Sequence, residues 1–96
     1  MAHGFLVHGA EDHVGVAVRD LRARERVSGV FLTSGKAIEI STIEEIPLGH
    51  KVAIMDIEAG EGLRKYGEVI GTATQPIETG AHVHVHNVKS VRWGSV

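Results

Sequence analysis

The sequence predicts a single all-β domain built from short strands. Three observations lead to this prediction: apolar and polar residues alternate in short runs, glycines separate these runs, and the chain of 96 residues is long enough for only one core. The twelve glycines favour a twisted sheet folded over on itself, or a small barrel, rather than a flat sandwich.

The N-terminal part of the chain contains two expected strands. Residues 5–8 form a short apolar run, and residues 13–18 carry alternating valines, so each segment predicts a strand. Residues 20–26 are charged, with Ala and Leu between the charges, and are expected to form a helical turn or a loop.

A hairpin is expected next. Residues 27–33 and 36–40 would pair around Gly35, because glycine supplies the positive φ that a tight turn needs. Residues 43–46 are ambiguous, and Pro47 disfavours a helix in the residue before it.

The strongest strand prediction covers residues 50–57, in which Val52 and Ile54 lie on one face. Residues 58–62 contain two glycines and predict a turn, and residues 65–74 are expected to be irregular. No internal repeat is expected.

Composition limits the classes of function. The net charge of −2, with basic residues scattered, indicates no nucleic-acid partner. The chain has no cysteine, which leaves no disulfide framework, thiolate site or cysteine-based zinc site. No apolar run is long enough to cross a membrane, and the N-terminus lacks the pattern of a secretion signal, so we expect a cytoplasmic protein without a membrane partner.

The segment His-Val-His-Val-His-Asn at residues 82–87 is the most informative in the chain. We expect residues 82–88 to form a strand with its histidines on one face, where imidazoles suit a metal, an anion or proton transfer. In a straight strand the Cα atoms of His82 and His86 would lie ~13 Å apart, so an adjacent pair would bind one ion more easily. We therefore expect His84 and one neighbour to bind a metal, the alternative being solvated surface histidines.

Two other segments carry candidate functional groups. His50 and Lys51 open the expected central strand and could contact a carboxylate or a metal-bound water, although an ordinary solvated strand end is equally consistent. Lys65 precedes Tyr66, and a neighbouring ammonium makes this phenol a candidate proton carrier or oxyanion donor. The alternative for Tyr66 is a half-buried anchor whose hydroxyl bonds to the backbone.

These motifs together, over roughly residues 4–88, resemble the N-terminal domain of the altronate and galactarate dehydratase family. Five segments carry this resemblance. They are Asp12 to Val18, Gly49-His50-Lys51, Lys65-Tyr66-Gly67-Glu68-Val69-Ile70-Gly71, Gly80 and His84-Val85-His86-Asn87.

The resemblance implies an SAF-type β-clip, in which bent β-ribbons fold over into a compact, mostly antiparallel body. On this basis residues 1–88 form the domain, and residues 89–96 form a C-terminal tail in which Arg92 and Trp93 could dock a partner. Full-length members of the family eliminate water from sugar acids with a divalent metal, usually Fe²⁺. We therefore expect Fe²⁺ as the cofactor of this chain, with Mn²⁺ or Zn²⁺ as alternatives. The chain would thus be the small subunit of a hydro-lyase, inactive without a separate large subunit, and the isolated chain could self-associate.

Residue roles follow from combining the motifs with the resemblance. The metal ligands would be His84 and His86, as the resemblance implies. The candidate catalytic residues are Lys65, Tyr66 and His50, and the candidate substrate-binding residues are His50, Lys51 and Asn87.

Different functions are also consistent with these residues. Small subunits similar to this chain serve (2R)-sulfolactate sulfo-lyase, which expels sulfite. The chain could instead be a non-catalytic module that binds a sugar acid or another carboxylate, or a structural subunit with incidental histidines.

Overall fold

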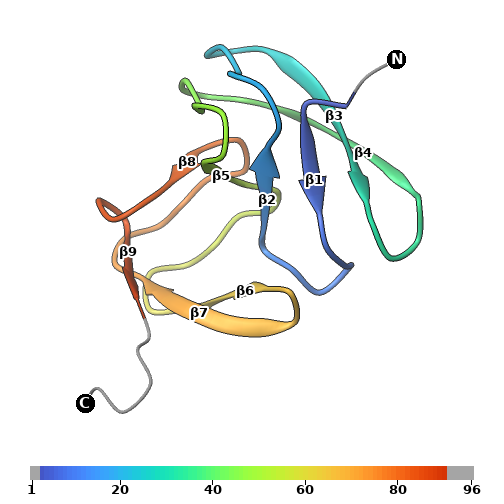
Figure 1. The fold of residues 1–96 in the computed structure, drawn as a ribbon. Coiled ribbons are helices and arrows are strands. Elements are labelled where there is room, and N and C mark those ends of the chain that lie inside the picture. Colours follow the sequence, from blue (N-terminus) through green and yellow to red (C-terminus); the bar gives the residue numbers. More distant parts are fainter. Residues whose placement is uncertain (1–2, 91–96) are drawn as a thin grey trace.

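The computed structural model describes residues 3–90, which form strands and turns and contain no helix (Figure 1). The strands are β1 (Phe5–Val7), β2 (Val14–Ala17), β3 (Arg26–Phe31), β4 (Ala37–Ser41), β5 (Lys51–Ala53), β6 (Gly62–Lys65), β7 (Glu68–Ala73), β8 (His82–Val83) and β9 (Val88–Ser90). The predicted all-β class is confirmed. No helix in this described part of the chain is long and apolar enough to cross a membrane.

The strands form two sheets. The first has six strands in the order β4-β3-β1-β2-β5-β8, and the second has three in the order β6-β7-β9. Among the paired strands only β1 and β3 run parallel, so the body is mostly antiparallel, as expected. In Figure 1 the second sheet lies at one end of the first, and the chain passes between the two sheets more than once.

Two apolar clusters stabilise these sheets. The first lies within the six-stranded sheet and its turns and contains Phe5, Val7, Ala17, Leu21, Val27, Ile40, Ile46 and Val52. The second joins the two sheets and contains Val14, Ala53, Ile57, Leu63, Ala73, Ile77, Ala81 and Val83. Burial of these side chains is the main force that folds the short strands together.

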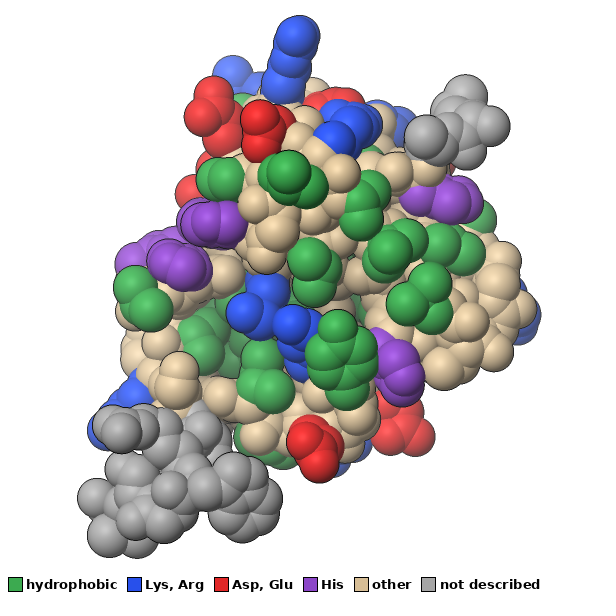
Figure 2. Space-filling model, in the orientation of Figure 1, with side chains coloured by type: hydrophobic (Ala, Val, Ile, Leu, Met, Phe, Trp, Pro, Cys, Tyr) green, Lys and Arg blue, Asp and Glu red, His purple; other side chains and the backbone are tan. Residues whose placement is uncertain are grey.

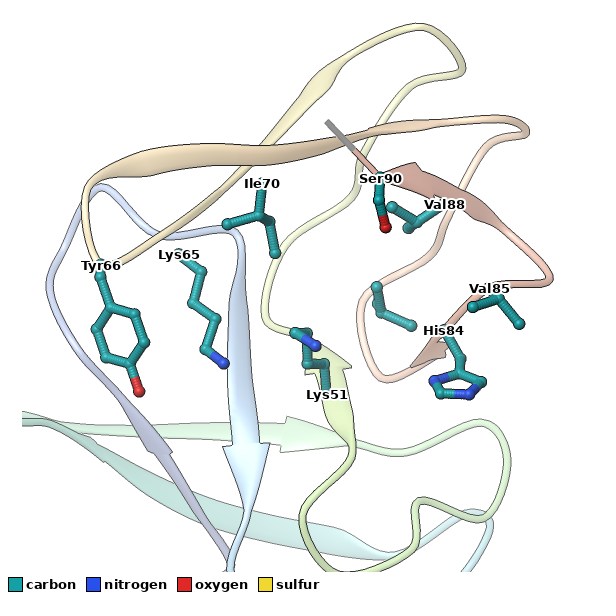
Figure 3. A pocket seen from close by; sticks show the side chains of 9 residues that line it. Lys51, Lys65, Tyr66, Ile70, His84, Val85, Val88 and Ser90 are labelled. Carbon is teal, nitrogen blue, oxygen red and sulfur yellow. The ribbon is translucent and has the colours of Figure 1, made fainter. Parts of the chain in front are cut away.

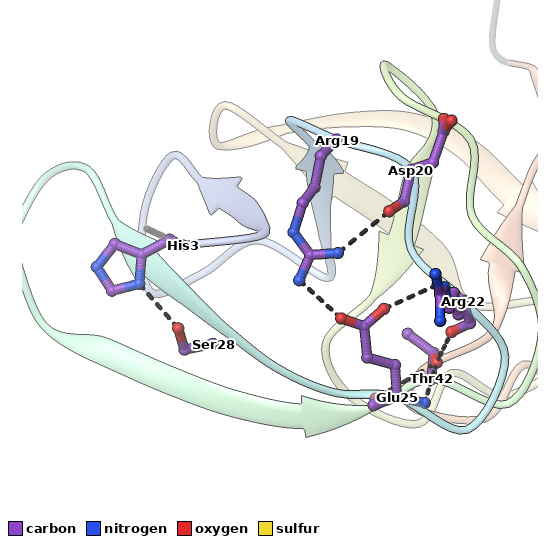
Figure 4. A network of polar contacts seen from close by, with 7 residues as sticks. All are labelled: His3, Arg19, Asp20, Arg22, Glu25, Ser28 and Thr42. Carbon is purple, nitrogen blue, oxygen red and sulfur yellow. Dashed lines mark hydrogen bonds and ion pairs between the residues drawn. The ribbon is translucent and has the colours of Figure 1, made fainter. Parts of the chain in front are cut away.

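The β3–β4 hairpin forms as predicted. Gly35 has a φ of 75° at its tip, and Val27 pairs with Ile40 in the ladder. The charged segment before β3 is a turn rather than a helix (Figure 4). Glu25 closes that turn by accepting hydrogen bonds from Arg19 at 2.7 Å and from the Arg22 N–H at 2.8 Å, and the Arg19 bond is the main reason that the pKa of Glu25 is lowered.

A turn of the same form occurs four times, at residues 18–24, 43–49, 54–60 and 74–80, so the expectation of no internal repeat was wrong. Each turn has a buried aliphatic residue at its centre, and these residues are Leu21, Ile46, Ile57 and Ile77. Each turn also ends on a residue with positive φ, and these residues are Arg24, Gly49, Gly60 and Gly80.

The four turns pair two by two. Leu21 and Ile46 form one isolated bridge, and Ile57 and Ile77 form the other. Sequence comparison within the chain misses this repeat because only the central aliphatic residue and the last, left-handed residue need to be similar.

Two strand predictions need correction. The strand expected over residues 50–57 is limited to β5, because the third repeated turn begins at residue 54. The irregular segment expected over residues 65–74 is instead the β6–β7 hairpin, whose tip is Tyr66 and Gly67, with φ of 57° and 76°. Tyr rarely adopts positive φ, so no local signal in the sequence indicates this turn.

Candidate functional site

The histidine-rich segment turns back instead of continuing as one strand, so the strand predicted over residues 82–88 was wrong. β8 ends at Val83 and β9 begins at Val88. Asn87, only 3% exposed, closes the turn: its Oδ1 accepts from the His84 N–H at 2.9 Å, and its Nδ2 donates to the His82 carbonyl at 2.9 Å. Its amide therefore replaces the ladder bonds of a continuous strand.

This turn brings the histidine rings together. The ring centroids of His82 and His84 lie 5.4 Å apart, and those of His82 and His86 lie 5.5 Å apart. The straight strand from which the wide spacing of His82 and His86 was expected does not form, and their rings lie close together. Figure 2 shows the resulting group of histidine side chains at one side of the face that it draws.

His50 joins this group from the adjacent strand end. Its Nδ1 lies 2.8 Å from the Nε2 of His82, and its ring stacks on that of His84 at 4.9 Å. His50, His82 and His84 each offer one nitrogen, and these nitrogens all lie within 4.8 Å of one another. The set does not include His86, which the sequence had paired with His84.

The three nitrogens fit a divalent transition metal. Two nitrogens bound at ~2.1 Å to one ion lie roughly 3–4 Å apart, so small side-chain rotations would bring this set onto an ion. Neutral imidazole is the form that binds a metal. The pKa of His82 is lowered, mainly by burial and then by the neighbouring His50 and His86, which favours this neutral form.

A pocket of about 400 Å³ lies next to the histidines (Figure 3). Its polar lining comes from Lys51, Lys65, Tyr66, His84 and Ser90, and its apolar lining comes from Ile70, Val83, Val85 and Val88. Figure 2 shows basic side chains in a hollow that apolar side chains surround.

Two ammonium groups share this pocket. Lys51 begins β5 and Lys65 ends β6, so the two sheets each supply one lysine, and both side chains point into the same space (Figure 3). The pKa of Lys51 is lowered, first by burial and then by the charge of Lys65. An anion in the pocket would offset both effects, because a nearby negative charge favours the charged form of each amine.

Tyr66 lies beside the lysines and is 58% exposed. The Lys65 Nζ lies 5.0 Å from the centroid of its ring, and His8 contacts the ring edge-on at 5.0 Å. The hydroxyl makes no hydrogen bond within residues 3–90, so the structure does not favour the alternative of an anchor bonded to the backbone.

The structure thus gathers most of the residues that the sequence selected. Lys51, Lys65, Tyr66 and His84 line one pocket, and His84 also belongs to the three-histidine set. Asn87 is set apart, because both polar atoms of its side chain bind the backbone of the turn. Its substrate-binding role stays a prediction.

His82 is the neighbour of His84 that the resemblance did not select. Its proximity to His50 depends on the pairing of Val52 with His82 between β5 and β8, for which the sequence carries no signal. The tail residues Arg92 and Trp93 lie outside the described residues, and β9 ends at Ser90, two positions into the expected tail.

Comparison with known proteins identifies the family of this chain. Residues 3–91 match the altronate/galactarate dehydratase SAF domain. The chain is 40% identical over 94 residues to (2R)-sulfolactate sulfo-lyase subunit alpha of Chromohalobacter salexigens, covering 97% of this chain and 100% of that protein. The corresponding subunit of Paracoccus pantotrophus is 49% identical over 64 residues, covering 67% of this chain and 96% of that one.

A longer relative matches this chain over only a small part of its own length. Altronate dehydratase of Bacillus subtilis is 39% identical over 86 residues, which cover 90% of this chain. The match covers only 16% of that enzyme.

Proposed function

Because the chain belongs to the altronate/galactarate dehydratase SAF-domain family, we propose that it is the small subunit of a lyase that acts on a 2-hydroxy carboxylate. The observation that carries this proposal is the pair Lys51 and Lys65 in one pocket, with Tyr66 and His84 beside them. Two ammonium groups and a phenol are donors suited to the carboxylate of such a substrate.

Both named activities of the relatives are eliminations of the same type. The C–H bond on the carbon that carries the hydroxyl and the carboxylate breaks, and its electron pair forms the new C=C bond. The leaving group departs from the next carbon with its bonding pair, as water after protonation in a dehydratase or as sulfite in a sulfo-lyase. The enol product then becomes a 2-oxo acid.

The chain's own residues have distinct roles in this proposal. Lys51 and Lys65 bind the anionic groups and stabilise the negative charge that develops on the carboxylate as the proton leaves. The Tyr66 hydroxyl donates a hydrogen bond at the same end of the pocket or carries a proton.

The metal is part of the proposal. His50, His82 and His84 would hold a divalent ion, with Fe²⁺ as the first candidate and Mn²⁺ or Zn²⁺ as alternatives. The resemblance instead pairs His84 with His86, so the two ligand sets share only His84. When bound, the ion supplies Lewis acidity toward a substrate oxygen.

A second chain would complete this site. The pocket opens on the surface of a small domain, and enclosure strengthens the electrostatic interactions that an elimination needs. We therefore propose a large subunit that covers the pocket and brings further catalytic groups, in the cytoplasm, with Arg92 and Trp93 as part of its contact.

The presence of two lysines in the pocket also indicates which substrates fit it. A substrate with an anionic group at each end, such as sulfolactate or galactarate, could pair with both ammonium groups, whereas altronate has one carboxylate. This favours water elimination from a dicarboxylic sugar acid, or sulfite elimination from sulfolactate, over dehydration of altronate.

The test is to co-express the chain with a large subunit of the same enzyme and to assay altronate, galactarate and sulfolactate. We expect turnover of one acid by the pair and none by this chain alone. Lys51→Met and Lys65→Met should each lower kcat/KM at least tenfold, whereas Lys36→Met, at the exposed tip of the β3–β4 hairpin, should leave it unchanged. Unchanged turnover in both pocket variants would contradict the proposal, and binding without turnover would support the non-catalytic module.

A further inference from the structure

Asp12 is a buried carboxylate that contacts the tip of a distant hairpin. It lies between β1 and β2 and is 1% exposed. One oxygen accepts from the Tyr66 N–H at 2.9 Å, and the other accepts from the Gly67 N–H at 2.9 Å. Both acceptor oxygens are therefore used at a single two-residue turn.

That turn has an unfavourable residue at its first position. A two-residue turn with positive φ at both positions normally uses Asn-Gly or Asp-Gly, because a larger side chain is strained there. Tyr66 has a φ of 57° and Gly67 a φ of 76°. A strained residue persists when the surrounding structure holds it in place, and such residues cluster at functional sites.

The hydrogen bonds to Asp12 hold Tyr66 in this conformation. Charge-assisted hydrogen bonds to two successive N–H groups fix the peptide planes on either side of the Tyr66 Cα, and these planes set the direction in which the ring leaves the backbone. The ring lies 5.0 Å from both the His8 ring and the Lys65 ammonium, and it lines the pocket beside Lys65 (Figure 3).

We propose that Asp12 is the positioning residue that presents Tyr66 to the Lys51/Lys65 pocket. It acts through the turn and does not contact the substrate. The inference rests on the proposed function in one respect, since the value of a fixed Tyr66 depends on a ligand in that pocket.

A purely structural role is the competing explanation. Asp12 also ties the β1–β2 loop to the second sheet, so any loss of stability could be mistaken for loss of positioning. Asp56, which is exposed, offers a control with the same number of bonds, because its Oδ1 accepts from the Thr79 N–H and the Thr79 hydroxyl, both at 2.9 Å. It therefore also makes two turn-closing bonds, but to a turn that does not line the pocket.

The experiment compares Asp12→Asn with Asp56→Asn by nuclear magnetic resonance. The chain has a single Tyr, so selective labelling gives one set of ring signals. We expect Asp12→Asn to abolish the nuclear Overhauser contact between the Tyr66 and His8 rings, and Asp56→Asn to retain it. Titration with galactarate and with sulfolactate, followed at the lysine side chains, should show at least tenfold weaker binding in Asp12→Asn and less than twofold change in Asp56→Asn.

Each outcome separates the two proposals. A retained Tyr66–His8 contact in Asp12→Asn would overturn the positioning role. Loss of that contact, with no binding of either acid even in the wild type, would support the positioning role and count against the proposed function. If Asp12→Asn does not fold, amide exchange in the wild type decides the question. We expect the Tyr66 and Gly67 amides to exchange at least tenfold more slowly than free-chain amides, and free exchange would overturn the role.

Discussion

The Nδ1 of His50 lies 2.8 Å from the Nε2 of His82, so two imidazoles from neighbouring strand ends share one hydrogen. The bond requires that at least one of the two facing nitrogens is unprotonated, and it is lost when both rings are charged. The pair also unites the histidine that precedes β5 with the one that opens β8. Its protonation state therefore links the stability of the sheet to the metal affinity that we propose for the site.

The first prediction concerns stability and pH. The pKa of His82 lies below its usual 6.5, because burial and the neighbouring His50, His86 and His84 disfavour the charged ring more than Glu44 favours it. The unfolded chain therefore binds more protons than the folded chain in this range, and the free energy of unfolding falls as the pH drops from about 6.5 through the folded pKa.

Urea unfolding at pH 7.5 and pH 5.5 in the presence of a chelator measures this effect. We expect the wild type to lose more stability between these two values than His82→Gln does. Glu25 and Glu61, whose pKa values are lowered by their hydrogen bonds, lose their contributions only at lower pH, so they do not interfere. Equal losses in the wild type and His82→Gln would show that the His50–His82 pair does not control this transition.

The second prediction concerns which histidines bind a metal. If His50, His82 and His84 form the site, His82→Ala should weaken Co²⁺ binding at least tenfold, because it removes one of the three ligands. His86→Ala should change the affinity less than threefold. Titration of Co²⁺, followed by its visible absorption, distinguishes this set from the His84/His86 pair, for which the order of the two effects would be reversed.

The third prediction concerns the two lysines. Burial and the charge of Lys65 lower the pKa of Lys51, so Lys65→Met should raise that pKa by removing the second cause. The amine of Lys51 should then react more slowly with a reductive-methylation reagent at pH 8, as mass spectrometry of the peptide would show. Lys36→Met is the control and should leave the rate unchanged, because residue 36 lies in another hairpin. If Lys65→Met leaves the reaction rate of Lys51 unchanged, the charge of Lys65 does not influence the pKa of Lys51.

The structure shows which parts of the fold local sequence determines. The hairpin around Gly35 could be predicted, because a glycine at a tight turn between two alternating segments is a local signal. The hairpin around Tyr66 could not be predicted, because the stabilising partner of its tip is Asp12, 54 residues away in the sequence. The four repeated turns were missed for a similar reason, since their pairing depends on contacts such as Leu21 with Ile46.

The site shows the same division. Family-specific motifs selected Lys51, Lys65, Tyr66 and His84, and the fold places all four around one pocket. The His50–His82 contact escaped prediction, because it depends on the β5–β8 pairing and on the turn that Asn87 closes. A straight strand predicts the wrong distances between the histidines, because the side-chain amide of Asn87 closes a turn directly after β8.

The last prediction concerns two glycines that occupy the same position of the repeated turn. Gly60 has a φ of 87° and Gly80 a φ of 92°, so an alanine at either position meets similar backbone strain. A Cβ at Gly60 would meet no atom within 4 Å, whereas a Cβ at Gly80 would overlap the backbone carbonyl of Ser41 at the end of β4. We expect Gly60→Ala to lower the free energy of unfolding by about 1–2 kcal/mol, the usual cost of a left-handed alanine.

Gly80→Ala should cost at least about 3 kcal/mol, because the two backbones must also separate. Separation would break the hydrogen bond from the Ile43 N–H to the Gly80 carbonyl, which joins the second repeated turn to the fourth. Urea denaturation of both variants at 25 °C, followed by circular dichroism, provides the comparison. Similar losses in the two variants would mean that φ alone accounts for Gly80, and a much larger loss in Gly80→Ala would show that this glycine permits the close approach of two backbone segments.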